Sequence, residues 1–413
     1  MKLLYNICVA VYILLIRLVA PFNRKARLWC EGRKNLAERV RQAVGDAEHI
    51  VWIHSSSLGE FEQGRPIVDY IKEHHSDYKI LLTFFSPSGF EMRKNYPNAD
   101  YVFYIPADTR RGVRAFLDAV NPEVAIFVKN EFWLNMLSEL HNRNIRTYIV
   151  SAIFRSNSIF FSLFGGIWRK ALHSFDRLFV QDEASKRLLS KIGIESVVVA
   201  GDTRIDRVSA IAEAAERVAL VEEFKGDKRL FVAGSTWGPD EDILLPLINE
   251  NPDIKFVIAP HEMEETRIER IMREAKGGAV RYTKLAEGDL SKSQVLILDT
   301  IGLLSRVYGS ADWAYIGGGF GVGIHSTLEA VVFGMPVAFG PKYHKFREAH
   351  ELIELGVGRS VESVGELKAW FDEVKADDDY LARLSAIAKV YVEQNRGATK
   401  RVVDAIFGPH FNF

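Results

Sequence analysis

Short apolar runs alternate with longer amphipathic segments from residue 50 onward. Segments such as 61–75 separate them, with apolar positions at helical spacing. Runs that are apolar throughout are typical of parallel strands covered on both faces. The pattern predicts a doubly wound α/β domain over residues 35–205. Its strands are expected at 50–53, 79–85, 101–105, 124–128, 147–150, 178–180 and 197–200.

The same rhythm restarts after a charged, alanine-rich helical linker at 206–227. It predicts a second α/β domain over 228–385, with a last segment, 386–413, that packs back on the first domain. The fold class is therefore α/β, with two Rossmann-like domains facing across a cleft at the carboxyl ends of their strands. Strands of the second domain are expected at 230–233, 254–258, 295–298, 313–316 and 337–339.

The first residues form a separate apolar segment. Residues 3–20 are interrupted only by Asn6 and Arg17, and a basic cluster follows them. A bilayer span needs about 20 residues, so this segment is marginal, and the basic cluster lies on the wrong side for a signal peptide. We expect residues 1–21 to be a membrane anchor with the rest of the chain cytoplasmic. Both a tilted span and a helix lying in the interface fit this pattern.

Composition narrows the chemistry. The chain has 53 Lys and Arg against 54 Asp and Glu, which argues against a general nucleic-acid binder. Its only cysteines, Cys8 and Cys30, lie near the N-terminus and give neither a zinc site nor a disulfide framework. The spacing of His325, His344 and His350 matches no familiar metal site. No metal or other cofactor is therefore expected.

A glycine-rich turn follows the expected strand at 313–316. A helix over 325–333 would present its N–H groups to an anion near Gly318 and Gly319, and Glu329 would accept hydrogen bonds from a ribose diol. The alternative is that these glycines only serve the turns of the fold. Neither a dinucleotide fingerprint nor a P-loop is present, so a nucleotide-sugar site is the better interpretation.

Polar residues also follow other strands. Glu60 begins a helix after the first strand, where it is either a helix cap or a general base. Glu131 occupies a similar place, and Arg204 is either a cation for a leaving phosphate or a surface charge. Ser235 and Thr236 follow the first strand of the second domain and suit a phosphate.

Five motifs keep their order along nearly the whole chain. They are Trp52-Ile-His-Ser-Ser-Ser-Leu-Gly-Glu60, Glu131-Phe-Trp-Leu-Asn135, Ala233-Gly-Ser-Thr236, Asp299-Thr-Ile-Gly302, and Gly317-Gly-Gly followed by His325-Ser-Thr-Leu-Glu329. Together they resemble the 3-deoxy-D-manno-octulosonic acid (Kdo) transferases. The resemblance implies a GT-B glycosyltransferase of lipopolysaccharide biosynthesis. Such an enzyme transfers Kdo from CMP-Kdo to the lipid A precursor (lipid IVA) at the cytoplasmic face of the inner membrane.

The resemblance also implies roles for individual residues. The catalytic base falls on Glu60, and transition-state stabilisation falls on Glu131 and Arg204. The loops that contact CMP fall on His261, Glu262, Ile301, Gly302, Leu303, Ser326, Thr327, Leu328 and Glu329. The chain departs from the family at three places, with His261-Glu262 where Arg-His is common, Ser326-Thr327 where Asn-Pro is common, and Arg204 where lysine is common.

We therefore expect an inverting, metal-independent transferase with Glu60 as general base. Its partners are CMP-Kdo, the lipid A precursor and the inner membrane, and no nucleic acid. Two alternatives remain, namely a GT-B-like sugar-nucleotide epimerase and a non-catalytic, membrane-tethered nucleotide-binding protein. An epimerase has little use for the anchor, and a scaffold has little use for a shielded carboxylate at Glu60.

Overall fold

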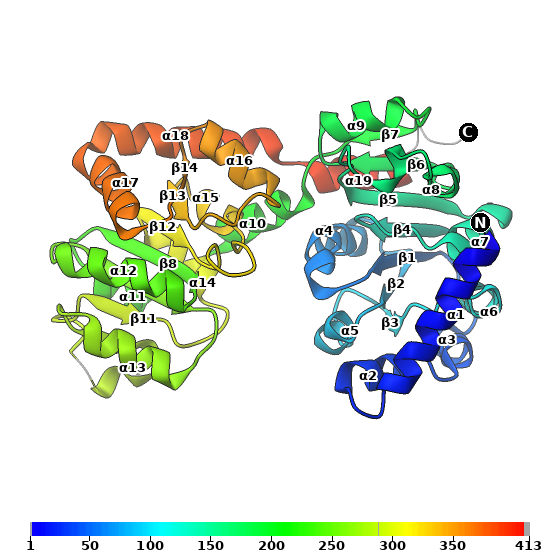
Figure 1. The fold of residues 1–413 in the computed structure, drawn as a ribbon, viewed down its shortest axis with the longest axis horizontal. Coiled ribbons are helices and arrows are strands. Elements are labelled where there is room, and N and C mark those ends of the chain that lie inside the picture. Colours follow the sequence, from blue (N-terminus) through cyan, green and yellow to red (C-terminus); the bar gives the residue numbers. More distant parts are fainter. Residues whose placement is uncertain (1, 288, 409–413) are drawn as a thin grey trace. The chain divides into compact units, whose positions relative to one another are not determined.

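The computed structural model describes residues 2–287 and 289–408 (Figure 1). Met1 of the expected anchor and residues 409–413 of the expected C-terminal segment lie outside them. The chain divides into two compact units, each described by itself below. Unit 1 comprises Met1–Asp206 with Arg396–Phe413, and unit 2 comprises Arg207–Asn395.

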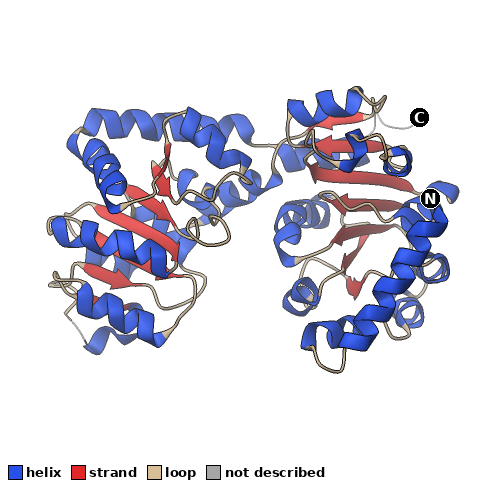
Figure 2. Cartoon of the chain, viewed as in Figure 1, coloured by secondary structure: helices blue, strands red, loops and turns tan. Residues whose placement is uncertain are grey.

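Unit 1 contains a seven-stranded parallel sheet with helices on both faces (Figure 2). The strand order is β3-β2-β1-β4-β5-β6-β7. All the strands expected from the apolar runs are confirmed, with small shifts at their ends. They are β1 (Ile50–Ser55), β2 (Lys79–Phe84), β3 (Tyr101–Tyr104), β4 (Val124–Val128), β5 (Arg146–Ala152), β6 (Arg177–Val180) and β7 (Val197–Val199).

Successive residues of β1 pack into two different hydrophobic cores. Trp52 lies in a core with helices α3 (Leu36–Val44), α6 (Arg110–Val120) and α7 (Leu134–Asn142). Val51 and Ile53 lie in another with α4 (Leu58–His74) and the C-terminal helix α19 (Ala398–Phe407). Side chains alternate between the faces of a strand, so a sheet covered on both faces requires apolar residues at every position. This explains the continuous apolar runs.

Unit 2 also contains a seven-stranded parallel sheet, in the order β10-β11-β9-β8-β12-β13-β14. The five expected strands are confirmed, but two edge strands, β10 and β14, were not expected. Each is three residues long and includes an arginine, which is too short and too polar to stand out as an apolar run. The strands are β8 (Leu230–Thr236), β9 (Lys255–Pro260), β10 (Ala279–Arg281), β11 (Val295–Ile297), β12 (Trp313–Ile316), β13 (Val337–Phe339) and β14 (Gly358–Ser360).

The unit boundaries differ in detail from the expected domains. The expected linker at 206–227 forms α10 (Thr203–Ala214) and α11 (Ala219–Lys225), and α11 packs on unit 2 through buried Val221 and Phe224. The segment that returns to unit 1 begins at Arg396, since α18 (Asp378–Asn395) still belongs to unit 2.

The helix expected over 325–333 is much shorter in the structure. Only α15 (Leu328–Val331) is helical. The other helices are α1 (Lys2–Val19), α2 (Arg24–Gly32), α5 (Pro87–Arg93), α8 (Gly166–Leu172), α9 (Glu183–Ser190), α12 (Gly238–Glu250), α13 (Glu265–Glu274), α14 (Leu304–Val307), α16 (Arg347–Glu354) and α17 (Val364–Ala376).

Candidate functional site

Glu60 lies in the first turn of α4, directly after the carboxyl end of β1. Ser57 caps this helix, and the two residues form a capping box. Glu60 Oε2 accepts from the Ser57 backbone N–H at 2.9 Å, and the Glu60 N–H donates to Ser57 Oγ at 3.4 Å. Within residues 2–287 and 289–408, Glu60 Oε1 has no hydrogen-bond partner. The cap therefore fixes one carboxylate oxygen and leaves the other for chemistry.

The surroundings of Glu60 favour its protonated form. Burial raises its pKa first, and the negative charge of Glu131 raises it further, while Lys129 and Ser57 act in the opposite direction. A carboxylate whose pKa moves toward neutrality is a stronger base than an exposed one. Glu60 thus combines a helix cap with the properties of a general base.

Glu131 lies in the loop after β4, close enough to Glu60 for their charges to interact. Its Oε2 accepts from Trp133 Nε1 at 2.7 Å and lies 3.7 Å from His54 Nε2. Burial acts to raise its pKa, but His54, Ser56 and Trp133 outweigh burial and lower it. The two carboxylates therefore have pKa values displaced in opposite directions, which is typical of acid–base sites.

His54 is a site residue that the sequence analysis did not select. It is buried at the end of β1, and its Nδ1 lies 3.1 Å from the carbonyl oxygen of Thr83. A carbonyl only accepts, so Nδ1 donates and the ring is held with Nε2 toward Glu131. The one signal in the sequence was its place at the end of a strand that carries Glu60 downstream.

A groove of about 420 Å³ connects Glu131 with the first helix. Its wall includes Asn130, Glu131, Phe132 and Trp133 from the loop after β4, and Trp168 from α8. Helix α1 provides the remaining wall through Tyr5, Cys8, Val9 and Tyr12. The expected anchor thus borders the loop that carries a candidate catalytic carboxylate.

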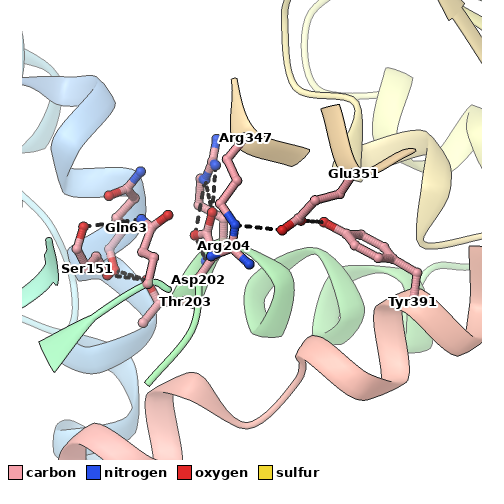
Figure 3. Close-up of polar contacts among 9 residues, drawn as sticks. Gln63, Ser151, Asp202, Thr203, Arg204, Arg347, Glu351 and Tyr391 are labelled. Carbon is pink, nitrogen blue, oxygen red and sulfur yellow. Dashed lines mark hydrogen bonds and ion pairs between the residues drawn. The ribbon is translucent and has the colours of Figure 1, made fainter. Parts of the chain in front are cut away.

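Arg204, at the start of α10, is paired with Asp202 (Figure 3). Its Nε lies 3.1 and 3.0 Å from the two carboxylate oxygens, and its Nη2 lies 2.6 Å from Oδ2. The neighbouring Thr203 hydroxyl donates to the Gln63 carbonyl at 2.5 Å, which fixes this segment against α4. Arg204 is therefore well positioned, but Asp202 offsets much of its charge.

Figure 3 also draws a separate polar cluster of unit 2. Arg347 donates to Glu351 at 2.6 Å, and Tyr391 donates to the other oxygen of that carboxylate at 2.8 Å. These contacts join α16 to α18 and stabilise the C-terminal part of this unit.

The glycine turn of unit 2 packs tightly against its own backbone. A Cβ on Gly317 would lie 2.2 Å from the Ser235 carbonyl oxygen, and one on Gly319 would lie 2.5 Å from Gly340 Cα. Gly318 has a φ of +92°, in the left-handed region. The fold itself thus requires these glycines, as in the alternative stated for this turn.

Asp240, another residue not selected from the sequence, holds this turn in place. Its buried carboxylate accepts from the Gly318 N–H at 2.9 Å, the Trp237 N–H at 2.8 Å and the Tyr315 hydroxyl at 2.8 Å. Burial raises the pKa of Asp240, and these hydrogen bonds act against that effect.

Glu329 lines a small cavity of about 100 Å³ in unit 2. Arg207 from α10, Ser305 from α14 and Phe333 also line it. Burial raises the pKa of Glu329, while Arg207 lowers it. Leu328 and Thr327 beside it are buried, and the Thr327 hydroxyl has no hydrogen-bond partner in the described part of the chain. The cavity therefore offers a carboxylate and hydroxyls to a small polar group.

The other expected nucleotide contacts are dispersed around the same sheet edge. Thr236 is fully buried and donates to Glu241 at 3.1 Å, whereas Ser235 beside it adopts a left-handed φ of +53°. Glu262, Ile301 and Gly302 are exposed, and Leu303 and Ser326 are half-buried. Exposed residues in loops leave room for a ligand, but their geometry does not assign a contact to each of them.

His261 lies between two other rings. Its ring centroid is 4.8 Å from that of Trp237 and 4.4 Å from that of His325. Burial, followed by the charge of His261, lowers the pKa of His325 to about 4. His325 is therefore neutral at physiological pH and accepts from Trp237 Nε1 at 3.4 Å. Among the described residues, no group of histidine, cysteine and acidic side chains suits a metal ion.

Comparison with solved structures identifies the architecture. UDP-GlcNAc 2-epimerase from Neisseria meningitidis aligns with a TM-score of 0.61 at 16% identity, over 87% of this chain and 99% of that chain. At this identity the likeness shows the fold alone. Two Rossmann-like units of this kind define the GT-B class.

Sequence comparison then identifies the relatives. Residues 34–207 match the family described as 3-deoxy-D-manno-octulosonic-acid transferase (kdotransferase). The 3-deoxy-D-manno-octulosonic acid transferase of Haemophilus influenzae is 24% identical over 393 residues, which cover 91% of each chain. The chain is a glycosyltransferase related to the Kdo transferases.

A second relative is longer than this chain. The bifunctional glycosyltransferase/methyltransferase of Fusobacterium nucleatum is 24% identical over 377 residues, which cover 87% of this chain. The aligned region spans 57% of that relative's length.

Proposed function

We propose that the protein transfers Kdo from CMP-Kdo to the lipid A precursor, lipid IVA, in lipopolysaccharide biosynthesis. The family match over residues 34–207 and the full-length relative of Haemophilus influenzae support Kdo as the sugar. The observation that carries the mechanism is the pair Glu60 and Glu131, whose pKa values are displaced in opposite directions.

In this proposal Glu60 is the general base. A sugar hydroxyl of the acceptor attacks the anomeric carbon of Kdo on the face opposite the phosphate. Its proton passes to Glu60 Oε1, the bond from the anomeric carbon to the phosphate oxygen breaks, and CMP leaves. A single displacement of this kind inverts the anomeric configuration. Glu131 remains ionised and stabilises the positive charge that develops on the sugar.

The donor nucleotide is assigned to unit 2. Glu329 accepts from the ribose hydroxyls of CMP, and the residues expected around it from the resemblance provide further contacts. Arg204 donates to the departing phosphate. No metal is needed in this scheme, because a monophosphate leaving group carries less charge than a diphosphate and backbone N–H groups can accommodate it.

The proposed location follows from the first helix. Within the described residues, α1 is the one helix long and apolar enough to cross a membrane. We propose that it attaches the enzyme to the inner membrane with both units on the cytoplasmic face. The groove between α1 and Glu131 would then bring a lipid acceptor to the reacting groups.

A transfer assay tests the proposal. The protein is incubated with CMP-Kdo, with and without lipid A precursor, and free CMP is measured beside Kdo-modified lipid. We expect CMP release that depends on the acceptor. Release without any acceptor dependence would contradict the transfer reaction.

Glu60→Gln tests the base. The variant retains a hydrogen-bonding side chain but cannot take the proton, so we expect transfer to fall by at least about 10²-fold. The cap itself contributes only about 1 kcal/mol, so the melting temperature should change little. Near-normal transfer by a well-folded variant would exclude Glu60 as the base and leave Glu131 as the next candidate.

A further inference from the structure

Helix α1 lies along unit 1 and contacts it at both ends. Near its start, the Tyr5 hydroxyl donates to Asp108 at 2.5 Å, and Asn6 Oδ1 accepts from Asn135 Nδ2 at 2.8 Å. Lys2, one turn earlier, donates to Ser138 of α7. Figure 1 shows α1 running along the unit from α7 to α2.

The second half of α1 packs on the same unit. The ring of Tyr12 lies edge-on to Trp29 of α2, with centroids 6.1 Å apart, and is stacked 6.3 Å from Phe85. The less exposed positions of the helix, at 5, 6, 9, 13 and 16, recur every three or four residues. They form one continuous face against the unit.

The acceptor for Tyr5 is a built part of unit 1. Asp108 is 3% exposed, and its carboxylate also accepts from the backbone N–H groups of Asn135 and Met136 at 3.0 and 2.9 Å. Tyr5 adds a third hydrogen bond to this buried group. Removal of α1 from the unit would leave an acceptor without that partner, which is unfavourable.

The opposite face of α1 is apolar and exposed. Leu3 and Leu18 are 74% and 61% exposed, and Phe22 just beyond the helix is 90% exposed. The same face carries Leu4, Ile7, Val11, Leu14 and Leu15. A continuous apolar strip of this length on a water-soluble surface is unfavourable and indicates a lipid or protein partner.

Two further features favour a lipid surface as that partner. Exposed cations, Arg17, Arg24, Lys25 and Arg27, lie at the end of the strip, where they attract anionic headgroups. Exposed Leu163 and Phe164 lie in the loop that leads into α8, and Trp168 of α8 packs edge-on to Tyr5. Apolar residues from two separate segments therefore border the same helix.

We infer that α1 does not cross the bilayer but lies in the plane of its interface, with unit 1 on its polar face and acyl chains on its apolar face. Length alone does not decide between the two arrangements, because 18 residues of helix measure about 27 Å. The contacts decide it. A crossing helix would place Lys2, Tyr5 and Asn6 on the far side of the bilayer, out of reach of Ser138, Asp108 and Asn135.

Protease accessibility tests this arrangement. A short epitope is added before Met1, and inverted inner-membrane vesicles are prepared from cells that express the full chain. We expect protease to remove the epitope without detergent, because both faces of the argument place it beside unit 1. An epitope that is protected until detergent is added would show a spanning helix and overturn the inference. A second epitope at the C-terminus reports that unit 1 faces the protease.

Cross-linking provides the second measurement. Lys2→Cys and Ser138→Cys are combined in a chain in which Cys8 and Cys30 are replaced by serine, and the vesicles are treated with a short bismaleimide. We expect an intramolecular cross-link in the membrane-bound protein. The matched control pairs Ser138→Cys with Leu15→Cys, on the lipid face of the other half of α1, and should not cross-link. Absence of the Lys2–Ser138 cross-link would contradict the docked helix.

Flotation identifies the partner. The purified full chain is mixed with vesicles of phosphatidylglycerol and phosphatidylethanolamine, and we expect it to float with them. If it instead remains in solution as a dimer, a second copy covers the apolar face and the lipid assignment is wrong. None of these measurements depends on transferase activity, so they can fail independently of the proposed reaction.

Discussion

Residues with opposing electrostatic surroundings make up the candidate acid–base site. Burial and Glu131 raise the pKa of Glu60, while Lys129 lowers it. A base works in its ionised form, so activity should fall as pH decreases through this raised pKa. The two charged neighbours of Glu60 therefore predict shifts of opposite sign.

Glu131→Gln removes a like charge, so the pKa of Glu60 should fall and the acid limb of kcat/KM should move to lower pH. Lys129→Asn removes an opposite charge and should move that limb to higher pH. Asparagine tolerates the left-handed φ of +64° at this position. The profile is measured for each variant, whatever its maximal rate. Limbs that do not move in either variant would show that Glu60 is not the titrating group.

Glu329 provides the corresponding test for the nucleotide. Glu329→Gln preserves shape but weakens acceptance from a diol, so CMP affinity should fall by about 1–3 kcal/mol, as for a hydrogen bond to a charged group. Calorimetric titration with CMP measures this change, and Glu354→Gln at an exposed position of α16 is the control. Equal affinity in both variants would return Glu329 to a structural role.

Individual elements are held in place by a few buried polar contacts. The glycine turn after β12 depends on Asp240, which accepts two backbone N–H groups and the Tyr315 hydroxyl. Because the carboxylate is fully buried, its partners have no water to replace it.

Asp240→Asn should lower the free energy of unfolding by about 1–3 kcal/mol, because one amide oxygen cannot serve three donors. Asp242→Asn, on the same helix but exposed, should change it by less than about 0.5 kcal/mol. Denaturant titration of both variants checks this. Equal stabilities would mean that the turn forms without Asp240.

At the scale of the whole molecule, the chain passes between the units twice, after Asp206 and after Asn395. The first crossing is tied to the second within unit 1. Asp206 accepts from the backbone N–H groups of Gly397 and Thr399, both at 2.6 Å. This contact fixes the start of α19, whose Val402 and Ile406 complete one core of unit 1.

Asp206→Ala should therefore destabilise unit 1 by about 1–3 kcal/mol, since it leaves two N–H groups without a charged acceptor. Asp227→Ala, at an exposed position, is the matched control. Hydrogen exchange should show faster exchange in α19 in the first variant alone. Unchanged protection of α19 would mean that core packing suffices to hold it.

The sequence by itself determined the two parallel sheets and the place of Glu60. Apolar runs report strands covered on both faces, and the end of a parallel strand always reaches the same edge of the sheet. The tertiary structure decided what no local pattern contains. It placed His54 behind Glu131, paired Asp202 with Arg204, and used the glycines of the turn for close packing of the backbone. It also laid α1 against unit 1, because a helix of 18 apolar residues has the same sequence pattern whether its partner is lipid or Asp108, a residue far along the chain.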